Sequence, residues 1–286
     1  MKTRWSLPLL FGLATFGVCG APPAHADEAD AQYRRGLELT KQGNLDEAQA
    51  ALETALKLRP RYAAAELSLG NVLRKKKRCD AAVPHYQAAV ALEPKDPYAN
   101  GNLGVCLHQI GKSDEAITAL ERAVAAAPND VLWRSSLGVI YRQRKDNEKA
   151  LLHLERAVQI DPRSVDAVRN LAVALRQAGQ LPRAEEMTKK AIALAPQDSD
   201  LRFNLGTLYR RQQKTAEAIA AYQEAVRLND SNADAYYDLG VMLSQERRGA
   251  EAIAAYNRYI ELIGTRDPKG VETARQQVKA LGGTPR

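Results

Sequence analysis

The sequence predicts an all-α protein, a solenoid of about seven helix–turn–helix repeats of 34 residues with a C-terminal capping helix. A Leu-Gly pair and two alanines recur in one register in almost every period. Apolar residues make up 45% of the chain but aromatic residues only 6%. This alanine-rich composition favours closely packed helices, because alanine loses no side-chain entropy in a helix. The period itself, which is typical of stacked helical repeats, is marked by Pro60, Pro94, Pro128, Pro162 and Pro196.

One period, residues 131–164, shows how each repeat is expected to fold. Asp130 is placed to cap a first helix, and the polar stretch 142–147 separates that helix from a second apolar series. Pro162 ends the second helix, since proline cannot continue a helix interior. The glycine and the alanines recur where the two helices approach, and a larger side chain there would cost about 1–3 kcal/mol. Ala172 replaces the glycine in one period.

The ends of the chain differ from the repeats, which are expected over residues 27–266. A secretory signal peptide is predicted over residues 1–26, from the bases Lys2 and Arg4, the apolar run 7–18 and the cleavage pattern Ala24-His25-Ala26. The run is too short for a bilayer span of about 20 residues, and a lipoprotein anchored at Cys19 is the alternative. Residues 267–286 are expected to form the capping helix and tail, with Asp267 as N-cap. The protein is therefore predicted to be exported, to the periplasm.

Cleavage of the signal peptide would leave two cysteines, Cys79 and Cys106. An even number of cysteines in a compartment that permits disulfides suggests a bridge between neighbouring repeats. The alternative is that both are small buried apolar residues.

One period carries a resemblance to a known family. Leu205-Gly206, Tyr209, Ala218, Tyr222 and Ala225 together resemble the tetratricopeptide repeat, and the resemblance extends over about residues 29–266. The aromatic residue usual near the start of the first helix is mostly absent. The resemblance implies a right-handed superhelix in which the first helix of each repeat lines a concave, protein-binding groove.

Two rows of side chains are expected to face this groove. Asparagines can hydrogen-bond an extended peptide backbone without reading its sequence, and arginines suit carboxylates because the guanidinium donates two parallel hydrogen bonds. The second row also ends the first helices, where a cation complements the helix dipole. Phe203 and Tyr237 are expected either to clamp an apolar side chain or to fill the core. The candidates in the two rows are Asn102, Asn170 and Asn204, and Arg74, His108, Arg142, Arg176 and Arg210, with Asn71 as a further peptide-binding candidate.

The sequence contains no pattern of a catalytic or metal site. No two histidines stand at metal-ligand spacing on one helix, and phosphate-binding and nucleophile motifs are absent. We therefore expect no enzyme activity, cofactor or metal. Cleavage would remove Lys2 and Arg4 and lower the net charge from +7 to +5, spread along the chain. Export argues against nucleic acid as the partner.

The sequence thus predicts an exported scaffold that holds an extended, acidic peptide segment in its groove and supports assembly of an envelope complex. The alternative partner is a polyanionic glycan or an anionic membrane surface. The basic turn 74–78, Arg-Lys-Lys-Lys-Arg, would bind it. Membrane contact is expected only through such turns or a lipidated Cys19.

Overall fold

The computed structural model describes residues 23–286, and all fifteen elements within them are α-helices. Most of the predicted signal peptide lies outside the described residues. Helix α1 begins at Pro23, before the cleavage point expected after Ala26. None of the helices in residues 23–286 is long and apolar enough to cross a membrane.

The chain divides into two compact units, which we describe separately. The first ends at Leu92 and contains α1 (Pro23–Gln42), α2 (Leu45–Leu58), α3 (Ala63–Lys75) and α4 (Cys79–Leu92). The second begins at Glu93 and contains α5 (Pro97–Gln109), α6 (Ser113–Ala126), α7 (Val131–Gln143), α8 (Asn147–Ile160), α9 (Val165–Gln177), α10 (Leu181–Leu194), α11 (Ser199–Arg211), α12 (Thr215–Leu228), α13 (Ala233–Gln245), α14 (Gly249–Ile263) and α15 (Pro268–Ala280).

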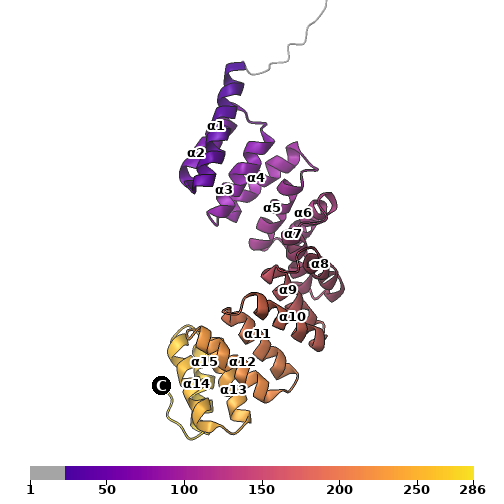
Figure 1. Cartoon of the computed structure of the whole chain (residues 1–286). Helices are drawn as coiled ribbons and strands as arrows, with labels where there is room; N and C mark the ends of the chain where they lie inside the picture. Colours follow the sequence, from indigo (N-terminus) through magenta and orange to yellow (C-terminus); the bar gives the residue numbers. More distant parts are fainter. Residues whose placement is uncertain (1–22) are drawn as a thin grey trace, which may run out of the picture. The chain divides into compact units, whose positions relative to one another are not determined.

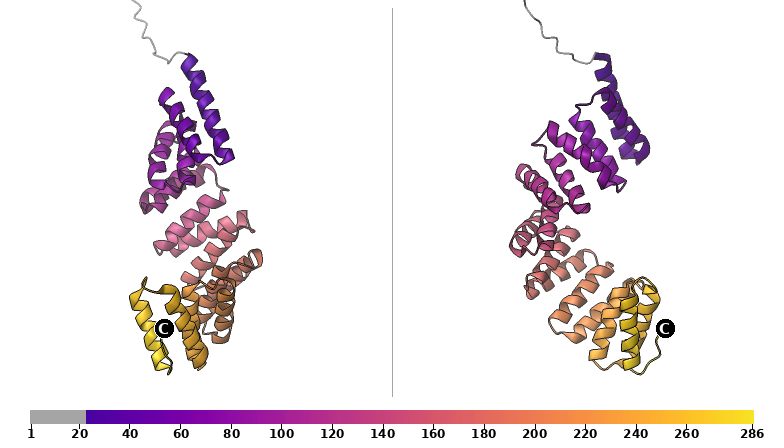
Figure 2. Two further views of the ribbon diagram at one scale, coloured as in Figure 1. Left: turned by 90° about the vertical axis from the view of Figure 1, so that its left-hand side faces the viewer. Right: turned by 180° about the vertical axis from the view of Figure 1, so that it is seen from behind.

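Helices α1–α14 form seven consecutive pairs, which confirms the predicted helical-repeat solenoid. Each odd-numbered helix is the first of its repeat and packs on the even-numbered helix that follows (Figure 1). In the second unit, α7 also contacts the first helices on either side of it, α5 and α9. We call the surface formed by α5, α7, α9, α11 and α13 the first-helix face. The pairs of this unit follow one another in chain order in every view (Figure 2).

Side chains cap the first helices of the second unit. The carboxylate of Asp130 accepts a hydrogen bond from the backbone N–H of Trp133 at 2.9 Å, which confirms the predicted cap. Loss of such a cap typically costs about 1 kcal/mol. The equivalent caps of α5, α9, α11 and α13 are Asp96, Ser164, Asp198 and Asn232.

The recurring glycine is required by a contact inside each repeat. A Cβ on Gly138 would lie 2.4 Å from Leu154 Cγ, so the two helices approach too closely for any side chain there. The opposing residue always stands sixteen positions later, and is a leucine or a tyrosine in the six repeats that have the glycine. In the remaining repeat the pair is Ala172 and Thr188, both buried. A smaller opposing side chain therefore leaves room for the alanine, which explains the one gap in the glycine series.

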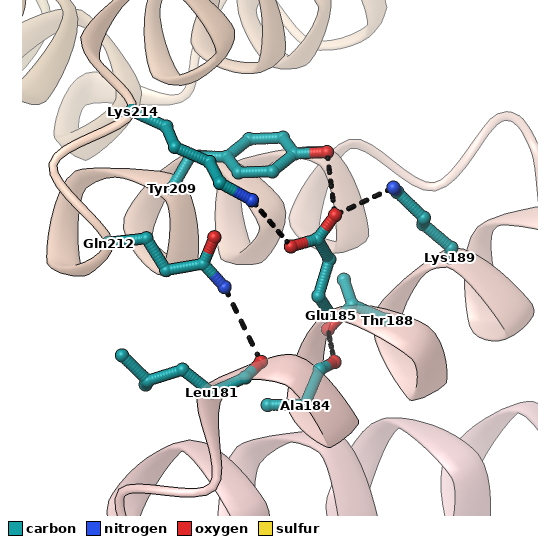
Figure 3. A network of polar contacts seen from close by, with 8 residues as sticks. All are labelled: Leu181, Ala184, Glu185, Thr188, Lys189, Tyr209, Gln212 and Lys214. Carbon is teal, nitrogen blue, oxygen red and sulfur yellow. Dashed lines mark hydrogen bonds and ion pairs between the residues drawn. The ribbon is translucent and has the colours of Figure 1, made fainter.

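A polar network links two successive repeats of the second unit (Figure 3). Glu185 of α10 accepts hydrogen bonds from Lys189 Nζ at 2.7 Å, from Lys214 Nζ at 3.1 Å and from the Tyr209 hydroxyl at 3.4 Å. The hydrogen bond from Lys189, supported by Lys214, lowers the pKa of Glu185 to about 2 even though burial opposes ionisation. The ionised carboxylate thus joins α10 to α11 and to the turn before α12.

Helix α15 forms where the capping helix was predicted, and packs against α14 (Figures 1 and 2). Its buried residues, Val271, Ala274 and Val278, continue the hydrophobic core of the last repeat. Asp267 caps the helix by accepting a hydrogen bond from the backbone N–H of Gly270 at 3.0 Å. The apolar side of the last repeat is therefore covered.

Candidate functional site

The first-helix face carries most of the residues that the sequence predicted for the groove. Asn102, Asn170 and Asn204 are half-buried on α5, α9 and α11. The basic row follows at the C-terminal ends of the first helices. In this row His108, Arg142 and Arg176 are half-buried, and Arg210 is exposed.

The two rows meet between successive repeats. Arg210 Nη1 on α11 lies 2.9 Å from Asp238 Oδ1 on α13, 28 residues later. Asp238 occupies the same register as Asn170 and Asn204, immediately before the recurring leucine that is Leu239 in its own repeat. One repeat earlier, Arg176 and Asn204 line one small hollow together. The basic residue of one repeat therefore faces the position before the leucine of the next.

Arg142 and Arg176 differ from Arg210 in their electrostatic surroundings. Burial lowers the pKa of both guanidinium groups, and for Arg176 the nearby charge of Arg211 lowers it further. Within the described residues neither forms an ion pair, whereas Arg210 pairs with Asp238. Both end their helices, so the stabilisation by the helix dipole that the sequence suggested also applies. Apart from the dipole, these two half-buried cations have no ion-pair partner in residues 23–286.

A cavity of about 560 Å³ opens on the first-helix face between α5, α7 and α9. His108 and Asn170 line it together with residues that sequence reasoning missed, including Leu132 and Ser135. Leu132 is 53% exposed. Burial lowers the pKa of His108, so the imidazole is neutral near pH 7. The exposure of Leu132 could have been predicted from the sequence, because the equivalent position of the three later repeats holds an aspartate, Asp166, Asp200 or Asp234.

Phe203 and Tyr237 line a second cavity, of about 340 Å³, near the C-terminal end of the first-helix face. The structure therefore brings this predicted pair together. Tyr259 of α14 adds a third ring, and Asp234, Asp238 and Asp267 add carboxylates. Asp238 shares the register of the asparagine row and Asp267 was expected only as an N-cap, whereas Tyr259 and Asp234 were not predicted.

The predicted residues of the first unit line neither of these two cavities, and some of them already contact other side chains of that unit. The Tyr86 hydroxyl donates to Asn71 Oδ1 at 2.9 Å, and Arg74 is half-buried at the end of α3. In the basic turn, Lys76 Nζ contacts Asp46 Oδ1 at 2.6 Å. Lys75, Lys77 and Arg78 are exposed.

The two predicted disulfide cysteines are both buried, Cys79 on α4 and Cys106 on α5. They belong to different units, and the bridge between them remains a prediction. In the part of the chain that the structure describes, no three histidine, cysteine or acidic side chains are grouped so as to hold a metal ion.

Comparison with known proteins identifies the repeat. One model of the tetratricopeptide repeat matches residues 33–97, 67–131, 109–165 and 203–270, and a second matches residues 141–205. The chain belongs to the tetratricopeptide-repeat family. Proteins of this family generally act as scaffolds without catalytic activity, so this tetratricopeptide-repeat chain is a scaffold for protein–protein interaction. No curated protein sequence matches it.

Solved structures share the fold at low sequence identity. A tetratricopeptide-repeat protein from Parabacteroides merdae is 18% identical with a TM-score of 0.65, over 90% of this chain and 100% of that one. PilW, described as a widely conserved type IV pilus biogenesis factor, is 20% identical with a TM-score of 0.65, over 75% of this chain and 98% of its own. YrrB, described as having an unusual peptide-binding site, is 18% identical with a TM-score of 0.54, over 67% of this chain and 97% of its own.

Proposed function

We propose that this tetratricopeptide-repeat protein is an exported scaffold that binds an extended, acidic segment of a partner protein along the first-helix face of its second unit. The observation that carries the proposal is the contrast between Arg210, which is paired with Asp238, and Arg142 and Arg176, which are half-buried and form no ion pair in the described chain.

Of the three equivalent arginines Arg142, Arg176 and Arg210, only Arg210 forms an ion pair with a carboxylate of the described chain. Asp238 lies beside Arg210, and the equivalent residue beside Arg176, one repeat earlier, is Asn204. Removing a charge from water without a partner is unfavourable, and a charge-assisted hydrogen bond between arginine and a carboxylate is about twice as strong as a neutral one. A glutamate or aspartate of the partner would take beside Arg142 and Arg176 the place that Asp238 takes beside Arg210.

The asparagine row complements this charge recognition. A side-chain amide offers both a donor and an acceptor to an extended backbone. Asn170 borders the cavity between α5, α7 and α9, and Asn204 borders the hollow beside Arg176. The partner backbone would be held by Asn170 and Asn204 while its acidic side chains reach the arginines.

An envelope location supports the same proposal. The residues expected to form a signal peptide would direct the mature chain out of the cytoplasm, and PilW, which shares the fold, is described as a type IV pilus biogenesis factor. The scaffold would accordingly support the assembly of an envelope complex. Lipidation at Cys19 is the alternative means of keeping it in the envelope.

The experiment that tests the proposal uses the mature chain, residues 27–286, and a fluorescent peptide of alternating glutamate and serine. We expect saturable binding that the double variant Arg142→Ala/Arg176→Ala weakens by well over tenfold, since each of the two lost hydrogen bonds to a charged group contributes about 1.5–3 kcal/mol. A peptide of alternating lysine and serine is the control. Equal binding by the wild type and the double variant would exclude these arginines as the site.

A second candidate function is binding of a polyanionic glycan or an anionic membrane surface by the basic turn of the first unit. Three exposed bases, Lys75, Lys77 and Arg78, favour it, whereas Lys76 is paired with Asp46. Heparin is a suitable probe. Lys75→Glu/Lys77→Glu would abolish heparin binding under this alternative and leave binding of the acidic peptide unchanged.

A further inference from the structure

The cavity near the C-terminal end of the second unit differs in chemistry from the rest of the first-helix face. Its walls come from α11, α13, α14 and α15, and include the rings of Phe203, Tyr237 and Tyr259. The centroids of Tyr237 and Tyr259 are 5.1 Å apart, and those of Phe203 and the buried Tyr222 are 5.7 Å apart. The rings are therefore fixed by packing against one another and against the core.

The charge of this cavity is negative, although the chain as a whole carries +7. Asp234, Asp238 and Asp267 line it, and no basic residue does. Arg210 compensates Asp238 from outside the lining. Asp267 is held by hydrogen bonds from the Gly270 N–H and the Tyr259 hydroxyl, which orient the carboxylate without neutralising it. Asp234 is exposed and forms no ion pair within residues 23–286.

A positively charged organic group matches both features. Aromatic faces attract cations, with about 0.5–1 kcal/mol at exposed sites and more where water is excluded. A divalent metal ion does not fit, because the described carboxylates are not grouped as metal ligands. Among protein side chains, arginine combines a planar cation that stacks on rings with a fork that matches carboxylates, whereas the lysine ammonium is a compact, strongly hydrated charge.

We propose that this cavity binds a basic side chain, arginine in preference to lysine, of the same partner segment whose acidic residues lie beside Arg142 and Arg176. The assignment to that segment rests on the proposed function. The partner is then a segment with opposite charges at its two ends. Its acidic part lies over α7 and α9, and its basic part lies between α11 and α15, which fixes its direction on the scaffold.

The cavity can be tested without knowing the partner. We would titrate the mature chain with N-acetyl-argininamide and follow the backbone amides of Gly270 and Thr273, which line the cavity, by NMR. N-acetyl-citrullinamide has the same shape without the charge, and N-acetyl-lysinamide carries the charge without the planar fork. We expect the arginine derivative to shift both amides and to bind more tightly than the other two.

The chain offers a matched pair of variants. Asp234→Asn should weaken binding of argininamide by about threefold, as expected for the loss of one exposed ion pair. Asp200→Asn removes the same charge at the same register one repeat earlier, where the residue is exposed and does not line the cavity. It should leave binding unchanged. Replacing Phe203 by leucine keeps the position apolar and should also weaken binding.

Several results would overturn this assignment. They are equal binding of argininamide and citrullinamide, equal or tighter binding of lysinamide, shifts confined to other amides, and equal effects of Asp234→Asn and Asp200→Asn. The amides report on the cavity, and in the wild-type chain the acidic peptide reports on Arg142 and Arg176. A failure of either experiment therefore leaves the other interpretable.

Discussion

The ion pair between Arg210 Nη1 and Asp238 Oδ1, at 2.9 Å, shows within the chain the contact that we propose for the partner. It joins the C-terminal end of one first helix to the middle of the next, at an offset of 28 residues. The same offset places Asn204 beside Arg176, where the carboxylate is missing. The ion pair of Arg210 and Asp238 therefore indicates how a carboxylate of the partner would bind beside Arg176.

Asp238→Asn should make Arg210 available as an additional arginine that can bind the acidic peptide. The change leaves an acceptor for the Tyr222 hydroxyl, which lies 3.2 Å from Asp238 Oδ2, and frees Arg210. Burial raises the pKa of Asp238, with Arg210 and Tyr222 opposing that shift, so ionisation of this carboxyl does not favour folding. We expect affinity for the acidic peptide to rise several-fold and the urea midpoint at pH 7 to be unchanged or higher. Weaker peptide binding by this variant would contradict the account.

The pairing of Ala172 with Thr188 predicts a compensating pair of substitutions. Thr188→Leu alone should lower the free energy of unfolding by about 1–3 kcal/mol, because the larger side chain meets the Ala172 methyl group. Adding Ala172→Gly recreates the glycine–leucine pair of Gly138 and Leu154 and should restore most of that loss. Urea denaturation of the two single variants and the double variant measures the coupling. Additive effects would show that these two sites do not meet.

The network around Glu185 predicts a loss of stability in acid. Its pKa is lowered to about 2 in the folded protein, so its contribution is present above the ordinary glutamate pKa and lost as the pH falls from about 4.5 towards 2. Glu185→Gln should therefore reduce stability near neutral pH and flatten its decrease on acidification. Glu186→Gln is the control, since Glu186 is exposed and has no ion pair in the described chain. Identical pH profiles for the two variants would contradict this role.

Processing of the N-terminus can be read from the mass of the protein purified from an exporting host. Cleavage after Ala26 would remove the Ala26 carbonyl, which accepts a hydrogen bond from Arg59 Nη2 at 2.9 Å. It would retain the ion pair of Arg59 with Asp30, also at 2.9 Å. We expect a mature chain that begins at Asp27. Under non-reducing conditions its mass also tests the bridge between Cys79 and Cys106. A mass that includes a lipid on Cys19 would replace this interpretation with the lipoprotein.

The sequence predicted the fold well because every repeat carries the same signals in one register. The cap at Asp130 and the capping helix after Asp267 follow from local rules and form as predicted. The gap at Ala172 was visible but unexplained, because its cause is the size of Thr188 on the other helix.

The candidate site was predictable only in part. Periodicity placed the asparagines and arginines on one face. It did not show that Asp238 pairs with Arg210, or that Arg142 and Arg176 form no ion pair within the described residues. The second cavity was missed for a related reason. Asp234, Tyr259 and Asp267 come from α13, from α14 and from the residue before α15, and only tertiary packing brings them together.

The central claim is that a carboxylate of the partner takes the vacant place beside Arg176, and Asn204→Asp tests it most directly. The substitution keeps the shape of the side chain and recreates the ion pair of Arg210 and Asp238 one repeat earlier. Gln223→Glu, at an exposed position on α12, adds the same charge away from the arginines. We predict that Asn204→Asp lowers affinity for the acidic peptide by about tenfold and that Gln223→Glu changes it little. Equal affinities of the two variants would contradict the account.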